Sequence, residues 1–201
     1  MQMATVRGMA GAARRAWISA SICLIAVGLL ATAGAQAQMS GMGGMSAPAG
    51  EAMQSPPAKA SIMLDGKSIA IAYGAPSVRG RKIMGGLVPY GEVWRTGANS
   101  ATALTTATDL MIGTLHVPAG KYTLYTLPSD GTWKLIVSKQ TGQWGTEYHQ
   151  AQDLGRIDMQ KETMVSPQEV MTIGFENTSG AKTQLHIKWE KTDVWVPVVA
   201  K

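Results

Sequence analysis

Hydrophobic and polar residues alternate with a period of two along most of the chain beyond residue 60. The pattern is clearest in residues 183–190, where Leu185, Ile187 and Trp189 fall on one face and His186 falls on the other. One-sided alternation of this kind is typical of antiparallel strands with one buried and one solvated face. It therefore predicts that His186 lies on the solvated face.

Turn-forming residues divide this pattern into about ten short strands. Asp65-Gly66, for example, is a two-residue hairpin signal between two alternating runs. The predicted strands cover residues 62–64, 67–73, 101–108, 110–112, 114–117, 121–127, 132–138, 154–159, 169–176, 183–190 and 194–199. Residues 165–169 are expected to form at most one helical turn. These features predict an all-β fold, either an antiparallel β-sandwich or an open barrel.

The first 37 residues contain the three regions of a secretory signal peptide. Arg7, Arg14 and Arg15 supply a positive start, residues 16–30 an apolar run, and residues 35–37 a small-residue cleavage site. The run is shorter than the roughly 20 residues that a spanning helix needs, which favours cleavage over an uncleaved membrane anchor. We therefore expect a periplasmic or secreted protein with no transmembrane helix after cleavage.

Export also changes the composition of the chain. Loss of residues 1–37 removes three arginines and no acid, so the formal net charge falls from +5 to +2. A charge this small does not indicate nucleic-acid binding. The single cysteine, Cys23, lies within the apolar run. The mature chain would therefore have no disulfide, no thiol nucleophile and no cysteine metal ligand.

Two parts are predicted beyond the cleavage site. Residues 38–59 are rich in Met, Gly and Pro, which predicts a flexible linker, and residues 60–201 are expected to form a single β-domain. The linker carries Met39, Met42, Met45 and Met53. Thioethers are soft ligands, so Cu(I) handling by this tail is one hypothesis. The alternative is a linker in which methionine is incidental.

A glycine-rich stretch between the second and third predicted strands gathers cationic, aromatic and amide side chains. The candidate ligand-binding residues in it are Arg79, Arg81, Tyr90, Trp94, Arg95 and Asn99. Guanidinium groups match carboxylate and phosphate groups bidentately, and Trp94 and Tyr90 offer ring faces. Trp144, from a second loop, is a candidate for the opposite wall. In the alternative interpretation, the arginines pair with Glu92, Asp109 or backbone carbonyls and only hold the loop on the sheet.

Four strings in the chain are similar to those of a known family. They are residues 73–81, 88–99, 118–124 and 143–145, of which residues 94–99 read Trp-Arg-Thr-Gly-Ala-Asn. Over about residues 60–198 the chain resembles the exported bacterial domain-of-unknown-function family 2911. The resemblance implies an exported, single-domain, all-β protein and no established activity. Family members often carry an acidic residue directly after that Asn, whereas this chain has Ser100; any chemistry of that acid would be missing here.

The leading functional hypothesis is non-enzymatic binding of a small polar or anionic ligand, a glycan or a cell-envelope component through the arginine-rich loop. An alternative is a hydrolase-type enzyme in which Glu147 and His149 act near Arg95, since side chains two positions apart point the same way in a strand. A purely structural envelope protein is a third hypothesis. No metal site is predicted, because two ligands fall short of the three or four protein ligands that zinc takes. No cofactor is expected.

Overall fold

The computed structural model describes residues 54–201, which form nine β-strands and one short 3₁₀ helix. The strands are β1 (Pro57–Leu64), β2 (Lys67–Gly74), β3 (Thr102–Thr106), β4 (Leu110–Ile112), β5 (Leu115–Val117), β6 (Gly120–Leu127), β7 (Trp133–Ser138), β8 (Asp153–Ser179) and β9 (Lys182–Ala200). The helix, η1, spans Gln150–Gln152. All paired strands are antiparallel, and they follow the order β1-β2-β3-β6-β7-β8-β9-β4-β5 in one sheet that is not closed.

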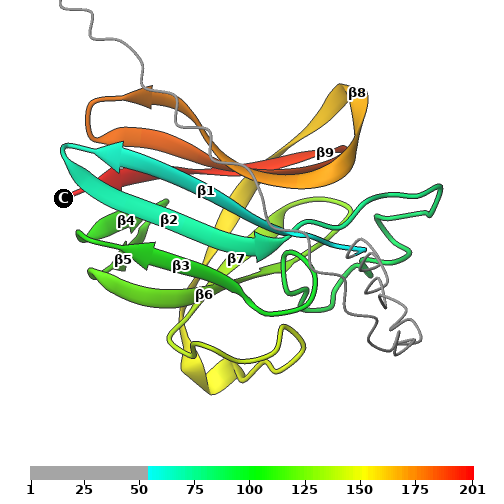
Figure 1. The fold of residues 1–201 in the computed structure, drawn as a ribbon, viewed down its shortest axis with the longest axis horizontal. Helices are drawn as coiled ribbons and strands as arrows, with labels where there is room; N and C mark the ends of the chain where they lie inside the picture. The colour runs from blue at the N-terminus through cyan, green and yellow to red at the C-terminus, as the bar shows by residue number, and fades with distance from the viewer. Residues whose placement is uncertain (1–53) are drawn as a thin grey trace, which may run out of the picture. The chain divides into compact units, whose positions relative to one another are not determined.

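The β1–β2 hairpin illustrates how the sequence sets a turn. Asp65 and Gly66 both have positive φ, 45° and 74°, as a two-residue type I′ turn requires at both central positions. Leu64 therefore pairs directly with Lys67. Figure 1 shows this hairpin beside β3, with β6 next in the sheet.

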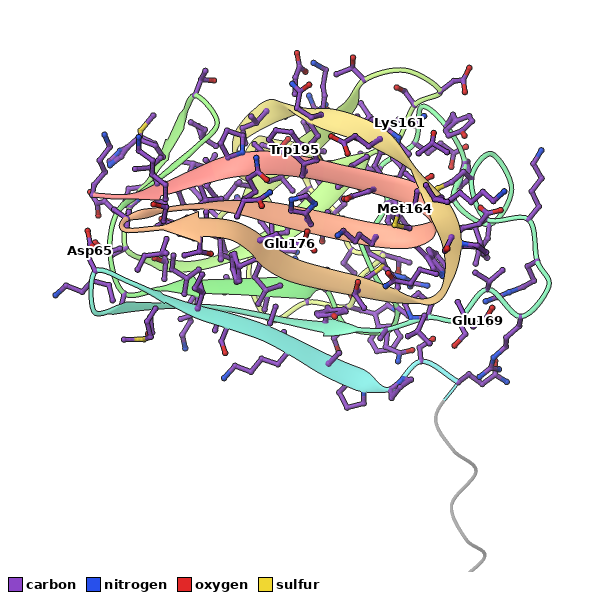
Figure 2. All side chains as sticks on the ribbon, turned by 90° about the horizontal axis from the view of Figure 1, so that it is seen from above. Asp65, Lys161, Met164, Glu169, Glu176 and Trp195 are labelled. Carbon is purple, nitrogen blue, oxygen red and sulfur yellow. The ribbon has the colours of Figure 1, made fainter. Side chains whose placement is uncertain are left out.

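Strand β8 pairs with different partners along its length. Residues 153–159 pair with β7, residues 160–163 with the C-terminal part of β9, and residues 168–176 with the N-terminal part of β9. Figure 2 shows the bend between the last two segments, where β8 passes Met164 and turns round toward Glu169. The chain thus uses one long strand where the sequence indicated two short ones.

Strand β9 bends at Glu190, where φ is 55°. The bend brings His186 and Asp193, seven positions apart, within 2.9 Å of each other through His Nδ1 and a carboxylate oxygen. In a straight strand seven residues would span roughly 23 Å. β9 and the part of β8 that pairs with it therefore form a folded two-stranded ribbon.

Buried hydrophobic side chains from all nine strands form one cluster. In β2 the inward positions are Ile69, Ile71 and Tyr73, every second residue, which is the period that the sequence shows. Trp133 and Trp189 are the largest fully buried side chains. Burial of one large apolar side chain stabilises a fold by about 1.5–3 kcal/mol, so this cluster supplies the main cohesion of the sheet.

The structure confirms the predicted all-β, antiparallel fold. Residues 165–169 contain no helical turn; they belong to β8 at its bend, where Val165 is almost completely exposed. The prediction for His186 was wrong: its ring is buried, because the bend of β9 places Asp193 beside it and stacks Trp195 on it with ring centroids 5.8 Å apart.

Strand β1 begins at Pro57, inside the segment that the sequence assigned to the linker, because Pro57 already pairs with Gly74 of β2. The predicted signal peptide, residues 1–37, and the linker as far as residue 53 lie outside the described residues. The four methionines of the Cu(I) hypothesis lie there too, so that hypothesis stays a prediction.

Candidate functional site

The loop between β2 and β3 is joined to β8 near its start. Val78 N donates to Glu169 O at 2.8 Å, and Met171 N donates to Pro76 O at 2.8 Å. These two bonds surround an isolated antiparallel bridge between the loop and the bend of β8. The arginine-rich part of the loop therefore leaves the sheet from a fixed position.

The end of the same loop is wedged against β2. Thr96 has φ of 54°, an unusual value for a β-branched residue. It is fully buried, its hydroxyl lies 3.1 Å from Thr126 Oγ1, and its carbonyl accepts from Thr102 Oγ1 at 2.9 Å. A Cβ on Gly74 would lie 2.3 Å from Ala98 O. This close approach requires glycine at the end of β2.

Trp94 lies just before the segment that packs against β2, and it faces the core. Its backbone N–H and C=O exchange hydrogen bonds with Thr126 of β6, at 2.8 and 2.9 Å. Its indole stacks on Trp189, with centroids 5.9 Å apart and planes inclined by 14°, and meets Trp133 at 87°. Because Trp189 covers one face of the Trp94 ring, at most one face is left for a ligand.

The loop that joins β7 to β8 lies along the arginine-rich loop. Ser100 and Trp144 form an antiparallel bridge, and Gly145 N donates to Asn99 O at 3.1 Å. A Cβ on Gly145 would lie 2.5 Å from Arg95 Cδ. The aliphatic part of Arg95 therefore packs directly on the backbone of the second loop.

A cavity of about 560 Å³ lies between these loops, a volume typical of small-molecule sites. Five of the seven predicted ligand-binding residues line it: Arg79, Arg81, Trp94, Arg95 and Asn99. Tyr90 and Trp144 are not among the described residues that do so. The Tyr90 ring packs toward Gly85, and Trp144 is half exposed.

The three arginines of the cavity form no ion pair with any carboxylate of residues 54–201. The Arg79 guanidinium donates to one backbone carbonyl at 3.1 Å, and the Arg81 guanidinium donates to two, at 2.6 and 3.1 Å. Asp109, considered as a partner, instead contacts His116 Nε2 at 3.0 Å. Within the described part of the chain, no Asp or Glu lines the cavity.

Residues 55–198 match the family described as "Protein of unknown function (DUF2911)". The chain belongs to this family. The match confirms the family that the sequence strings indicated, and it extends over almost the whole described domain. No curated protein and no solved structure matches the chain.

In this DUF2911 protein, Ser100 does not line the cavity within the described structure. It lines a neighbouring hollow together with small residues of β1 to β3 such as Ala72 and Ala103. An acid at position 100 would therefore project toward that hollow rather than toward the arginines. Serine in place of an acid at position 100 therefore does not change which charged residues line the cavity.

Two tyrosines that the sequence analysis missed form part of the cavity wall. Tyr125 OH donates to Glu147 O at 2.9 Å, and the two tyrosine rings meet edge-on at 5.0 Å. Tyr148 OH donates to Asp153 Oδ2 at 2.7 Å and accepts from Arg156 Nη2 at 2.7 Å. Burial, together with the hydrogen bond to Asp153, raises the pKa of Tyr148 to about 12. Both phenols are therefore neutral, fixed wall groups at physiological pH.

Asn99 lies in the left-handed region, with φ of 63°, a conformation that Asn tolerates. Its Nδ2 donates to Ser55 O at 3.1 Å, which ties the chain ahead of β1 to the rim of the cavity. The sequence predicted a fixed amide at this position. One of the two N–H donors of that amide is used by this backbone bond, which leaves the second N–H and the carbonyl oxygen as its polar groups for a ligand.

Glu147 and His149, the pair considered for hydrolysis, are exposed and are not among the described residues that line the cavity. The described structure thus does not bring them to Arg95 in one pocket. Residues 54–201 contain no group of three or more His, Cys, Asp or Glu side chains arranged to hold a metal ion. The same residues include no helix that is long and apolar enough to cross a membrane.

Proposed function

We propose that this protein is exported and binds a small anionic ligand, without transforming it, in the cavity between the two loops. The observation that carries the proposal is the charge of the wall: Arg79, Arg81 and Arg95 line it, and no carboxylate of the described residues does. Three guanidinium groups with no carboxylate beside them on the wall attract an anion, and Arg95, the only one of the three that is partly buried, is the least screened by solvent. The ligand would supply the missing negative charge.

Arg95 is the main anchor of this proposal. The described residues offer its guanidinium no hydrogen-bond acceptor, so all its N–H groups are available to a ligand. Its stem is nevertheless fixed, because Cδ packs on Gly145. A pre-positioned fork of this kind loses little side-chain entropy when it binds a carboxylate or phosphate bidentately.

The export signal predicted in residues 1–37 favours a ligand found in the periplasm or outside the cell. A charged fragment of a glycan or another envelope component would be found in this location. The cavity volume of about 560 Å³ accommodates a molecule of one or two sugar units better than a macromolecule. We therefore place the protein among small-ligand binders rather than among structural envelope proteins.

A thermal-shift and calorimetric screen of anionic envelope fragments against the purified protein tests the proposal. A ligand at 100 times its dissociation constant should stabilise the fold by about 2.7 kcal/mol. Arg95→Ala should remain folded but lose this stabilisation, measured against the melting temperature of the same variant without ligand. Lys67→Ala is the matched control, because Lys67 is an exposed cation of β2 that does not line the cavity.

Two outcomes would overturn the proposal. One is that no anion binds anywhere in the screen. The other is that Arg95→Ala and Lys67→Ala bind a ligand as tightly as the unmodified protein does, which would place the ligand elsewhere on the surface.

A further inference from the structure

The cavity differs from an ordinary polar pocket in the kind of charge it carries. Its three cationic side chains are all arginines, a residue type that carries its charge throughout the physiological pH range. None of the described residues that line it is Asp, Glu, His, Lys or Cys. The wall therefore holds a fixed positive charge that its own residues neither neutralise nor titrate.

Two carboxylates that contact residues of this wall are engaged with other groups. Glu169 Oε1 accepts from the backbone N of Arg79, at 2.8 Å, and not from its guanidinium. Asp153 lies behind Tyr148 and accepts from the Tyr148 hydroxyl and from Arg156 Nε, at 2.7 and 3.0 Å. One negative charge on a ligand would leave most of the cavity charge unbalanced, so a multiply charged group fits the wall better.

We propose that the cavity recognises a phosphate monoester in its dianionic form, carried on a body about the size of one sugar. This inference rests on the proposed function, since it specifies the anion that the same site takes. A phosphate monoester carries a charge of about −1.5 to −2 at pH 7 and presents three acceptor oxygens. Separate guanidinium forks can each bind two of these oxygens, whereas one carboxylate has only two oxygens to share.

The need for a body follows from the rest of the wall. A phosphate group alone would contact the arginines but would fill only a small part of the 560 Å³. The remaining lining includes the apolar and aromatic residues Leu87, Val93, Trp94 and Tyr148. Apolar and aromatic surface next to a few polar groups is typical of sites that hold the ring of a sugar or a similar small body.

A dianionic ligand would give the cavity an affinity that depends on pH near 6, whereas a purely structural cluster of arginines would show no such dependence. Tyr125 and Tyr148 have pKa values raised above 10 by burial, so neither titrates near neutrality. Glu92, Glu147 and His149 are exposed on the two loops, and none of them lines the cavity in the described structure. Any large change in affinity near pH 6 then arises from the ligand, whose second pKa is about 6.

The test compares body-matched anions by calorimetry on the full protein: glucose 6-phosphate, glucose 6-sulfate and glucuronate. Inorganic phosphate shows what the anion does without a body. Phosphatidylcholine vesicles containing phosphatidic acid show whether the source is a lipid headgroup. Each titration is repeated at pH 5 and pH 7, with Arg81→Ala and Arg95→Ala as site variants and His149→Gln as a control for titration of the loop.

We expect glucose 6-phosphate to bind at least about tenfold more tightly than the sulfate or the carboxylate at pH 7, since a tenfold ratio needs only about 1.4 kcal/mol from the second charge. Its affinity should fall about tenfold from pH 7 to pH 5, because most of the dianion is then protonated. The sulfate, a monoanion at both values, should show no such fall, and His149→Gln should behave like the unmodified protein.

The possible failures are distinguishable. Equal binding of phosphate, sulfate and glucuronate, or a pH dependence that the sulfate shares, overturns the dianion inference but leaves anion binding intact. Binding of inorganic phosphate as tight as that of glucose 6-phosphate, or binding to vesicles alone, overturns the sugar-sized body. Binding of none of these anions overturns this inference, and the screen of anionic envelope fragments then decides whether the proposed function also fails.

Discussion

The indole of Trp94 lies parallel to the indole of Trp189, with ring centroids 5.9 Å apart and planes inclined by 14°. Trp94 belongs to the arginine-rich loop, whereas Trp189 is the last residue before the bend of β9 at Glu190. Both residues line the cavity. This contact therefore links the position of the arginine-rich loop to the bend in the ribbon.

Replacing Trp189 by alanine should destabilise the protein by about 3–5 kcal/mol, as deletion of a large buried aromatic side chain does. Trp189 is 1% exposed and its loss would also remove the support behind Trp94. Urea unfolding monitored by circular dichroism measures the change. Trp144→Ala is the control: Trp144 is 50% exposed, so its loss should change stability by no more than about 0.5 kcal/mol. Equal losses in the two variants would contradict the proposed role of the stack.

Gly74→Ala should destabilise the fold and distort the cavity. The new Cβ would lie 2.3 Å from Ala98 O, so either the end of β2 or the loop must move. Overpacking of this kind costs about 1–3 kcal/mol. Gly131→Ala is the matched control, since a Cβ there meets open space. The measurement is again the free energy of unfolding, and a Gly74→Ala protein as stable as the Gly131→Ala protein would show that the wedge yields without strain.

The composition of the arginine-rich loop predicted much of the cavity because that single loop supplies all five predicted residues that line it. Arg79, Arg81 and Arg95 are polar side chains in a segment without strand periodicity, which is the pattern of a recognition loop. The residues missed, Tyr125 and Tyr148, come from β6 and from the second loop. They reach the cavity through tertiary contacts such as Gly145 N to Asn99 O, which no sequence spacing encodes.

In the fold, too, local features were predicted from the sequence and tertiary features were missed. Alternation with a period of two revealed the strands, because that period reports which face of a sheet is buried. The bends in β8 and β9 were interpreted as gaps between separate strands, since a break in alternation looks the same whether a strand ends or turns back. His186 was assigned to the wrong environment for this reason: only the bend at Glu190 brings Asp193 and Trp195 to its ring.

Asp193→Ala should weaken the bend of β9. The carboxylate is nearly buried, accepts from His186 Nδ1 at 2.9 Å and lies 3.5 Å from Lys188 Nζ. Its removal leaves a buried imidazole N–H and a partly buried ammonium without this acceptor, which costs about 1–3 kcal/mol. Hydrogen exchange of the β9 amides should rise near Glu190, where the strand turns.

Asp158→Asn provides the comparison, because Asp158 forms an exposed ion pair with Lys134. Exposed pairs of this kind contribute about 0–1 kcal/mol. If the two aspartate variants unfold at the same urea concentration, the network around His186 does not stabilise the bend.

Tyr148 should ionise only at very alkaline pH, and its ionisation should couple to unfolding. Burial, followed by the hydrogen bond to Asp153, raises its pKa from the ordinary value of 10.0 to about 12. A folded-state pKa above the unfolded value means that folding favours the neutral phenol. Its contribution to stability is complete below pH 10 and is lost as the pH rises through about 12.

In Tyr148→Phe, the free energy of unfolding should therefore fall less steeply over this window, and the tyrosinate absorbance that appears last in an alkaline titration should be missing. Asp153→Asn should move that late absorbance toward, but not to, the ordinary value, since burial, the larger cause, persists. An unchanged late absorbance in Tyr148→Phe would show that another tyrosine has the high pKa.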